Sequence, residues 1–184
     1  KNLQVKLKSD EYIWESPSSS IEGVEFLRKK IKDYAGVIAV GSGTVSDSIK
    51  YATFLEKKSY SVFATTPMNA YTTGTASISF DGIKKSLAAH YAQGVFFDLE
   101  VLSMCPKRLT AAAFADVICR TTAQVDWLMS HKILKTDYQT APYSLLALYE
   151  KDMIESASLI AKGDIEALAL LTRISAIMLS LIHI

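Results

Sequence analysis

The chain has 184 residues, of which 49% are hydrophobic and 21% are charged, and its formal net charge is +1. This composition is typical of a globular protein with a buried core, and the near-neutral charge gives no general attraction to nucleic acid or to an anionic membrane. No apolar run reaches the ~18 residues of a membrane-spanning helix. Because Cys105 and Cys119 lack metal-site spacing, we expect a protein of the reducing cytoplasm.

The first residues of the chain predict a strand and then a helix. Residues 1–8 alternate between polar and apolar side chains, as in a half-exposed strand, and do not resemble a signal peptide. A serine-rich loop follows, in which Ser19 or Ser20 is a candidate N-cap. Over residues 21–34 the apolar side chains recur at helical spacing, so we predict an amphipathic helix there.

A glycine-rich turn joins a predicted strand over 36–41 to a predicted helix over about 44–57. The turn consists of Gly41, Ser42, Gly43 and Thr44. Its glycines allow close approach of a ligand, and Asp47 is expected in the first turn of the helix, where the helix dipole favours an acidic side chain. Such a helix N-terminus is a site for an anion, usually a phosphate. The turn matches neither G-x-G-x-x-G nor a P-loop, so an ordinary tight connection is an equal alternative.

A second β-rich run over 60–66 completes a strand–helix–strand unit, which predicts a parallel sheet. Thr65, Thr66 and Asn69 follow this strand. In open α/β sheets ligands bind beyond the carboxyl ends of strands, so these side chains are candidates for contacts with ribose, nicotinamide or a substrate hydroxyl. Turn formation alone accounts equally well for the same residue types.

Two further β features close the first part of the chain. The Asp-Gly pair at 81–82 predicts a tight turn in a hairpin over about 75–87, and the apolar run 95–97 predicts a last strand. From residue 99 onward glycine nearly disappears and the pattern becomes helical. We therefore predict an α/β part over 1–98 and an all-α part over 99–184.

Three helices are predicted in the second part. The first covers residues 107–131. The second covers about 143–161 and ends at Gly163, and the third begins after the capping residue Asp164 and extends to about residue 181.

Asp116 is the most informative titratable residue, because it lies in an apolar helical stretch where a carboxylate needs a partner or a metal. Arg120 follows at i+4, and on spacing alone an ion pair between the two is the preferred interpretation. His90, His131 and His183 have no second His or Cys at ligand spacing, so local sequence predicts no complete metal site. No Ser-His-Asp or Cys-His arrangement is present, and no catalytic acid or base is nominated.

A series of motifs occurs in an order that points to one family. They are Gly41-Ser42-Gly43-Thr44-Val-Ser-Asp47-Ser-Ile-Lys50, Ala64-Thr65-Thr66-Pro67, Ser79-Phe-Asp81-Gly82-Ile-Lys84-Lys85-Ser86, Asp98-Leu, Pro106-Lys-Arg108-Leu, Ala112-Ala-Phe-Ala-Asp116 and Asp126-Trp127. The series resembles the sn-glycerol-1-phosphate dehydrogenase branch of the iron-containing alcohol dehydrogenase, glycerol dehydrogenase and dehydroquinate synthase superfamily. The resemblance covers residues 36–131 well and continues more loosely to the end.

The resemblance implies a dehydroquinate synthase-like fold, with a partial Rossmann-like dinucleotide-binding domain over 1–98 and a partial helical metal- and substrate-binding domain over 99–184. The turn from Gly41 to Thr44 would hold the pyrophosphate of NAD or NADP, and Asp47 would be a further cofactor-binding residue. Thr65 and Thr66 would line the nicotinamide side. Asp116 would be the first ligand of a divalent metal, typically zinc, that acts as a Lewis acid on the substrate oxygen.

The activity implied is metal-assisted, NAD(P)-dependent oxidoreduction of a small phosphorylated polyol of the glycerol 1-phosphate or dihydroxyacetone phosphate type. Three departures from the family pattern bear on it. Asn69 stands where the family has a substrate-side Asp, and Cys119-Arg120 stands where a Gly-Lys often follows the metal Asp. The family's two metal-binding histidines have no counterpart in the expected context. A catalytically silent nucleotide-binding relative, or a fragment of a longer chain, is therefore the alternative. A lyase of the dehydroquinate synthase type is a third hypothesis, and a homo-oligomer is compatible with each.

Overall fold

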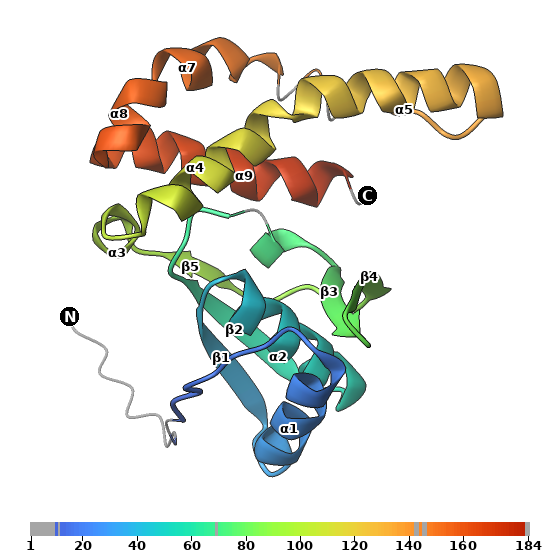
Figure 1. Cartoon of the computed structure of the whole chain (residues 1–184), viewed down its shortest axis with the longest axis vertical. Helices are drawn as coiled ribbons and strands as arrows, with labels where there is room; N and C mark the ends of the chain where they lie inside the picture. Colours follow the sequence, from blue (N-terminus) through green and yellow to red (C-terminus); the bar gives the residue numbers. More distant parts are fainter. Residues whose placement is uncertain (1–9, 11, 69, 142–143, 145–146, 183–184) are drawn as a thin grey trace.

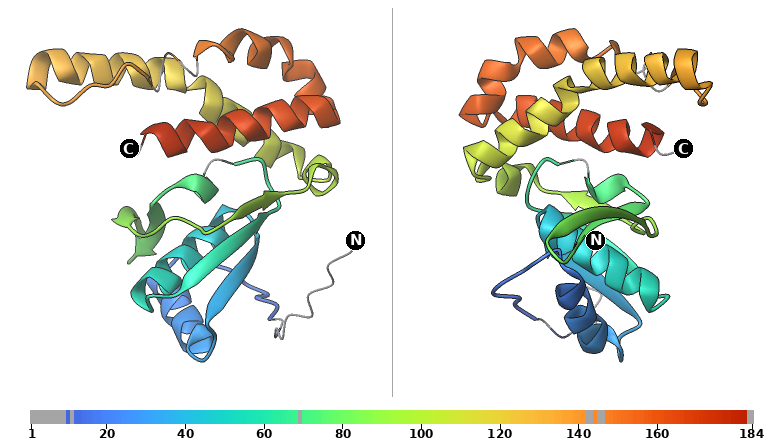
Figure 2. Two further views of the ribbon diagram at one scale, coloured as in Figure 1. Left: turned by 180° about the vertical axis from the view of Figure 1, so that it is seen from behind. Right: turned by 45° about the vertical axis from the view of Figure 1, so that its right-hand side comes forward.

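The computed structural model describes residues 10, 12–68, 70–141, 144 and 147–182. Two parts lie one above the other: an α/β part built from the first half of the chain and a layer of helices built from the second (Figure 1). The same division is visible from behind and from the side (Figure 2). The strand predicted over residues 1–8 lies outside the described residues.

Helix α1 (Ile21–Ile31) begins where the serine-rich loop ends. Ser20 is its N-cap, and the Ser20 hydroxyl accepts a hydrogen bond of 3.2 Å from the backbone N–H of Gly23. The predicted cap is therefore confirmed, since a side-chain oxygen here satisfies one of the N–H groups that the helix leaves unpaired. The helix ends at Ile31 rather than at residue 34.

The main sheet is parallel, as predicted. Strand β1 (Gly36–Gly41) leads through helix α2 (Gly43–Leu55) to strand β2 (Ser59–Ala64), and β5 (Val95–Phe97) pairs with the other edge of β2. The β1–β2 register pairs each residue of β1 with one of β2, so that Gly41 lies opposite Ala64. The two strands therefore end together at one edge of the sheet.

Helices α1 and α2 lie on one face of this sheet (Figure 1). The side chains that point toward them, including Ala39, Val62 and Ala64, are buried in a hydrophobic core shared with the two helices. On the opposite face Ile38 and Phe96 are exposed. This alternation follows from the two-residue period of a strand.

The predicted hairpin is present as β3 (Thr75–Phe80) and β4 (Ile83–Ala88), paired antiparallel and preceded by the short 3-10 helix η1 (Ala70–Thr72). Asp81 and Gly82 both have positive φ, 49° and 80°. A two-residue hairpin turn of this kind needs left-handed backbone at both positions, which Asp and Gly adopt more readily than most residues.

The helical part contains more helices than the sequence predicted. They are α3 (Leu99–Ser103), α4 (Lys107–Ile118), α5 (Arg120–Leu134), α7 (Glu150–Glu155), α8 (Ala157–Lys162) and α9 (Ile165–Ile182). The single helix predicted over 107–131 is wrong, because the chain bends at Cys119 between α4 and α5. The hydroxyls of Thr121 and Thr122 donate to the carbonyls of Ile118 and Cys119, and such side-chain bonds compete with the helical ladder.

The later helices follow the predicted signals at their ends. Part of the helix predicted over 143–161 lies outside the described residues, and the described part is divided into α7 and α8. Gly163 has φ 80° and ends α8, and the Asp164 carboxylate accepts a hydrogen bond of 3.0 Å from the N–H of Ala167. Both residues therefore have the capping roles predicted for them.

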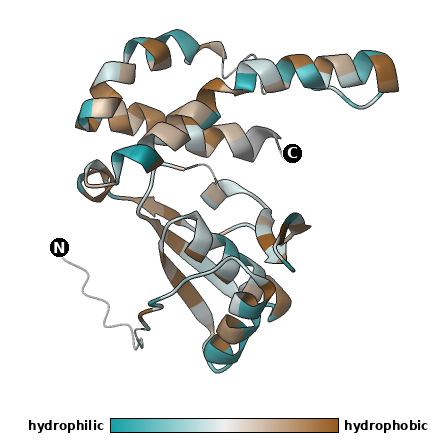
Figure 3. Ribbon diagram, viewed as in Figure 1, coloured by the Kyte–Doolittle hydropathy of each residue, from teal (hydrophilic) through white to brown (hydrophobic). Residues whose placement is uncertain are grey.

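A second hydrophobic core lies among the helices. Its buried members are Ala113, Val117, Met153, Ile160, Ala167, Leu168, Leu171, Ile174 and Met178. Figure 3 shows apolar residues concentrated in β1, β2 and α9. The two cores fall on either side of residue 98, but the boundary between 1–98 and 99–184 remains a prediction. None of the helices in the described residues combines the length and hydropathy needed to cross a membrane.

We expect Leu171→Ala to lower the free energy of unfolding by about 2–5 kcal/mol, because Leu171 is 0% exposed at the centre of the second core and truncation leaves a cavity. Leu148→Ala is the matched control, since Leu148 is 72% exposed and its loss is expected to cost less than about 0.5 kcal/mol. Urea unfolding of both variants measures the difference. Equal effects would contradict the placement of Leu171.

Candidate functional site

The glycine turn connects the end of β1 to the N-terminus of α2. Ser42 is the N-cap residue of α2, and its backbone carbonyl accepts the first helical hydrogen bond, 3.0 Å from the N–H of Ser46. The Ser42 hydroxyl makes no capping hydrogen bond, so the N–H groups of the first turn have no cap from this side chain. A helix N-terminus of this kind presents N–H donors and a positive dipole end to an anion.

Glycine suits the two positions of the turn for different physical reasons. A Cβ at Gly41 would lie 2.9 Å from Cβ of Val45, a contact too short for any side chain, so glycine lets β1 pass closely beside α2. A Cβ at Gly43 would meet only the Met68 sulfur, at 4.0 Å. The backbone at Gly43 therefore has free space beside it, as a site for a bound group requires.

Thr65 and Thr66 follow β2 but have different environments. The Thr65 N–H donates to the Gly41 carbonyl at 3.2 Å, so the two strand ends are joined at the turn, as the parallel sheet predicted. Thr66 is buried, and its hydroxyl lies 2.6 Å from the Tyr71 hydroxyl. The structure thus directs the Thr66 side chain toward η1, and Thr65, which is half-buried, is the nearer candidate for a ligand. Asn69, the predicted substrate residue, lies outside the described residues.

Tyr71 was missed by the sequence interpretation. It is 0% exposed in η1, and its hydroxyl donates a hydrogen bond of 3.2 Å to the Gly41 carbonyl. The Thr66 hydroxyl accordingly donates to Tyr71. Burial raises the pKa of Tyr71 to about 12, so the phenol stays protonated near neutral pH and keeps its donor role. No local pattern marks this residue, because Gly41, whose carbonyl it binds, is 30 residues away in the sequence.

Asp47 does not occupy the first turn of α2, and that prediction is wrong. The helix already begins at Gly43, which places Asp47 in its second turn. Its carboxylate is buried toward β3, where it accepts from the N–H of Ser77 at 3.2 Å and lies 3.6 Å from the Lys50 ammonium. Burial raises the pKa of Asp47, and the nearby Lys50 charge opposes that rise. A contact between Asp47 and a cofactor remains a prediction.

Lys50 was quoted in the motif series without a role. Its side chain is 0% exposed, and the ammonium donates to the carbonyl of Ala70 at 2.7 Å, the hydroxyl of Thr73 at 2.9 Å and the carbonyl of Thr75 at 2.9 Å. Burial lowers the pKa of Lys50, and Asp47 counters this effect. The signal available in the sequence was a lysine one helical turn after an aspartate on a largely apolar helix.

The η1 region also connects the α/β part to the helices. The Thr72 hydroxyl donates to the carbonyl of Ala176 in α9 at 3.0 Å, and Met68 packs against both hydrophobic cores. Figure 2 shows η1 between the sheet and α9. The glycine turn therefore lies close to the junction of the two parts.

Asp116 is exposed on α4, so the expectation of a carboxylate inside an apolar environment is wrong. The proposed local partner, Arg120, is buried and pairs with Glu150, with 2.5 Å between Nη2 and Oε2. The Cys119 sulfur lies 3.9 Å from Oδ1 of Asp116, and burial raises the pKa of the Cys119 thiol, which disfavours the thiolate that binds metals. Among the described residues no three His, Cys, Asp or Glu side chains are grouped to hold a metal ion. The residues present therefore do not fit a complete metal site around Asp116.

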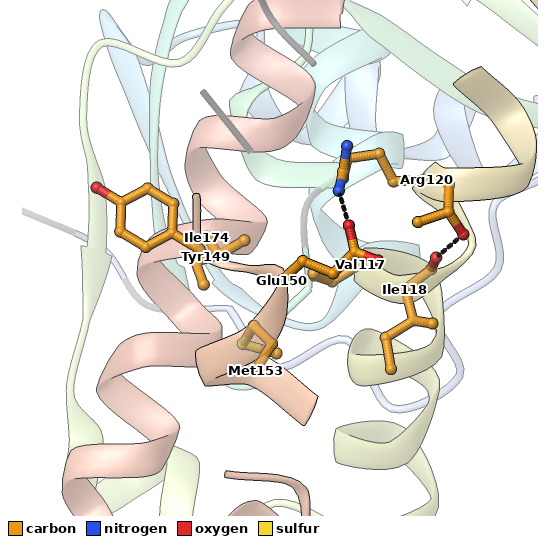
Figure 4. Close-up of a pocket in the computed structure, with 8 residues that line it drawn as sticks. Val117, Ile118, Arg120, Tyr149, Glu150, Met153 and Ile174 are labelled. Atoms are coloured by element: carbon orange, nitrogen blue, oxygen red, sulfur yellow. Dashed lines mark hydrogen bonds and ion pairs between the residues drawn. The ribbon is translucent and has the colours of Figure 1, made fainter. Parts of the chain in front are cut away.

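Figure 4 shows the small pocket beside this ion pair, where Arg120 and Glu150 point toward each other from α5 and α7. Its volume of about 10 Å³ holds roughly one water, so it has no room for a substrate. A larger cavity of about 240 Å³ lies among α3, α4, α8 and α9, and none of the predicted site residues lines it.

Comparison with known proteins adds independent information. A family model described as iron-containing alcohol dehydrogenase matches residues 1–106. The chain is 35% identical over 147 residues to a glycerol-1-phosphate dehydrogenase [NAD(P)+] from Pyrococcus abyssi, covering 78% of this chain and 42% of the relative. The enzyme of the same name from Pyrococcus horikoshii is 30% identical over 167 residues, covering 89% and 48%. The chain thus spans less than half the length of these relatives.

The fold also matches solved structures. An iron-containing alcohol dehydrogenase from Thermotoga maritima superimposes with a TM-score of 0.73 at 15% identity, over 95% of this chain and 52% of that one. This likeness confirms the predicted succession of a parallel α/β part and a helical part. The family model covers more than half of the 184 residues, and the chain therefore belongs to the iron-containing alcohol dehydrogenase family.

Proposed function

We propose that the chain binds NAD or NADP at the glycine turn and serves in an oxidoreductase that acts on a small phosphorylated polyol of the glycerol 1-phosphate or dihydroxyacetone phosphate type. One observation carries the proposal: the α2 N-terminus lacks a cap from Ser42, has open space at Gly43, and lies at the carboxyl edge of two parallel strands. The names of the Pyrococcus relatives support the choice of cofactor and substrate class.

The residues around the turn fit a dinucleotide. Backbone N–H groups of Gly43 and Thr44 would hold the pyrophosphate, together with the Ser42 hydroxyl, which makes no capping hydrogen bond to α2. Thr65, joined to Gly41 by its backbone, would lie next toward the nicotinamide. The bound nucleotide would supply the hydride acceptor or donor. Asp47, Thr66 and Asn69 also stay in the proposal, the first two as cofactor contacts and Asn69 as a substrate contact. Asp47 and Thr66 rank below the turn residues, because their side chains already bind protein groups.

We propose one protein ligand for a metal ion, which is Asp116. We propose that its exposed carboxylate contributes one ligand to a divalent ion, zinc by the resemblance, and we derive no reaction step through that ion. The incomplete donor set among the described residues favours a second candidate function, which is nucleotide binding without turnover. Zinc-supplemented assays of NADH oxidation with dihydroxyacetone phosphate distinguish the two candidates, since only the first predicts consumption of NADH.

We also propose a cytoplasmic location for the protein. Cys105 and Cys119 are both free thiols, which supports a reducing, cytoplasmic environment. We propose no nucleic-acid partner, because the net charge is +1. A homo-oligomer remains a proposal that sedimentation would test.

We expect isothermal titration to show binding of NADH, NADPH or both to the unmodified chain. Gly43→Ala is expected to weaken that binding by about tenfold or more, because the added methyl group occupies the space beside the turn that a pyrophosphate needs. The stability of the unliganded variant should not fall, since Ala is a better helix former than Gly and the space is free.

Gly41→Ala is the contrasting variant. Its Cβ would collide with Val45, so we expect a loss of stability in thermal unfolding as well as a loss of binding. If the unmodified chain binds neither nucleotide, the proposed function is wrong. If Gly43→Ala binds as tightly as the unmodified chain, the nucleotide does not sit on this turn.

Zinc titration tests the role of Asp116. We expect Asp116→Asn to lower zinc affinity by about tenfold or more, because the substitution removes the carboxylate charge while keeping the side-chain shape. Asp126→Asn is the control, since Asp126 is also exposed but is not a proposed ligand. Unchanged zinc affinity in Asp116→Asn would remove this residue from the metal site.

A further inference from the structure

We propose that Lys50 is a positioning residue for nucleotide binding: it fixes residues 70–75, here named the η1 segment, beside the glycine turn. This inference rests on the proposed function and adds to it a residue that never touches the nucleotide. It assigns a role to a buried charged group outside the turn.

The contacts of Lys50 are concentrated on this one segment. Its three hydrogen bonds go to Ala70, Thr73 and Thr75, at the beginning, middle and end of the η1 segment. An ammonium has three N–H donors, so every donor has an acceptor. Because the side chain is 0% exposed, water cannot replace any of these acceptors, and the segment is held in one place relative to α2.

The same segment forms the inner support of the turn. Tyr71 lies within it and donates to the Gly41 carbonyl, and Tyr71 also holds the Thr66 hydroxyl. Thr72, the next residue, donates to Ala176 in α9. A displacement of the η1 segment would therefore move the support of Gly41, the end of β2 and the contact with the helical part together.

Loss of Lys50 is expected to act on the nicotinamide half of the nucleotide more than on the pyrophosphate. The pyrophosphate would rest on the N–H groups of Gly43 and Thr44, which belong to the same helix as Lys50, whereas the η1 segment holds Gly41, before that helix begins. The nicotinamide half would lie toward Thr65 and the junction with α9, which the η1 segment supports. Loss of Lys50 should thus affect NADH more than ADP.

Lys50→Met and Thr73→Val are the test variants. The first removes the ammonium and keeps an unbranched side chain of similar length. The second keeps the side-chain shape and removes one acceptor of Lys50 together with the hydrogen bond that the Thr73 hydroxyl donates to the carbonyl of Ala70 or Thr75, and it serves if Lys50→Met fails to fold. Thr53→Val is the matched control, since Thr53 is buried in the same helix as Lys50 but its hydroxyl contacts His90 and its own helix.

Hydrogen exchange of the unliganded proteins gives the first measurement. We expect amides of the η1 segment to exchange about tenfold faster or more in Lys50→Met, and to a smaller extent in Thr73→Val, while amides of β1 and β2 keep their protection. Thr53→Val should leave exchange of the η1 segment unchanged. Unchanged exchange in a folded Lys50→Met protein would overturn the proposal.

Titration with NADH and with ADP gives the second measurement. We expect Lys50→Met to weaken NADH by about tenfold or more and to change ADP by less than about twofold. Equal losses for both ligands, or no loss for NADH, would overturn the positioning role. If the unmodified chain binds neither ligand, the proposed function fails and the nucleotide role of Lys50 fails with it, while the exchange result still decides whether Lys50 holds the segment.

Discussion

The parallel pairing of β1 with β2 is the constraint on which the candidate site depends. It places Gly41 opposite Ala64, so that both strands end at the same edge and the N–H of Thr65 reaches the Gly41 carbonyl. Parallel pairing requires a crossover, and α2 supplies it with its N-terminus at that edge. The turn, the first N–H groups of α2 and the residues after β2 therefore come together through one topological requirement.

The features that the sequence predicted well are those decided by neighbouring residues. Ser20 and Asp164 cap helices, Gly163 ends one, and the Asp-Gly pair forms the hairpin turn, because each role depends on the local backbone and on a side chain a few residues away. The parallel sheet was also predictable, since two β-branched runs separated by one helix have few other arrangements. The family assignment drew on the order of a separate series of motifs, of which the stretch with the Asp-Gly turn is one.

The rest depended on contacts between distant residues, which spacing does not contain. On spacing alone Asp116 was the preferred partner of Arg120, whereas the structure pairs Arg120 with Glu150, 30 residues along the chain. The hydroxyl of Thr66 engages that of Tyr71 in the buried interior, a contact that spacing did not indicate, and the role of Thr66 toward a cofactor remains a prediction. The Thr121-Thr122 pair was the local signal for the bend at Cys119, because both hydroxyls bond to backbone carbonyls of the preceding turn. Such bonds also occur in straight helices, so the pair alone did not predict a bend.

The contact between Thr72 and Ala176 has a consequence for how this protein can change in sequence. The acceptor is a main-chain oxygen, which every amino acid at position 176 would supply as long as α9 stays helical. Substitutions at position 176 are thus limited by the backbone geometry of α9 and by the volume of the side chain, not by its chemical identity. The donor side has no such freedom, because only a residue with a short side-chain donor at position 72 reproduces the bond.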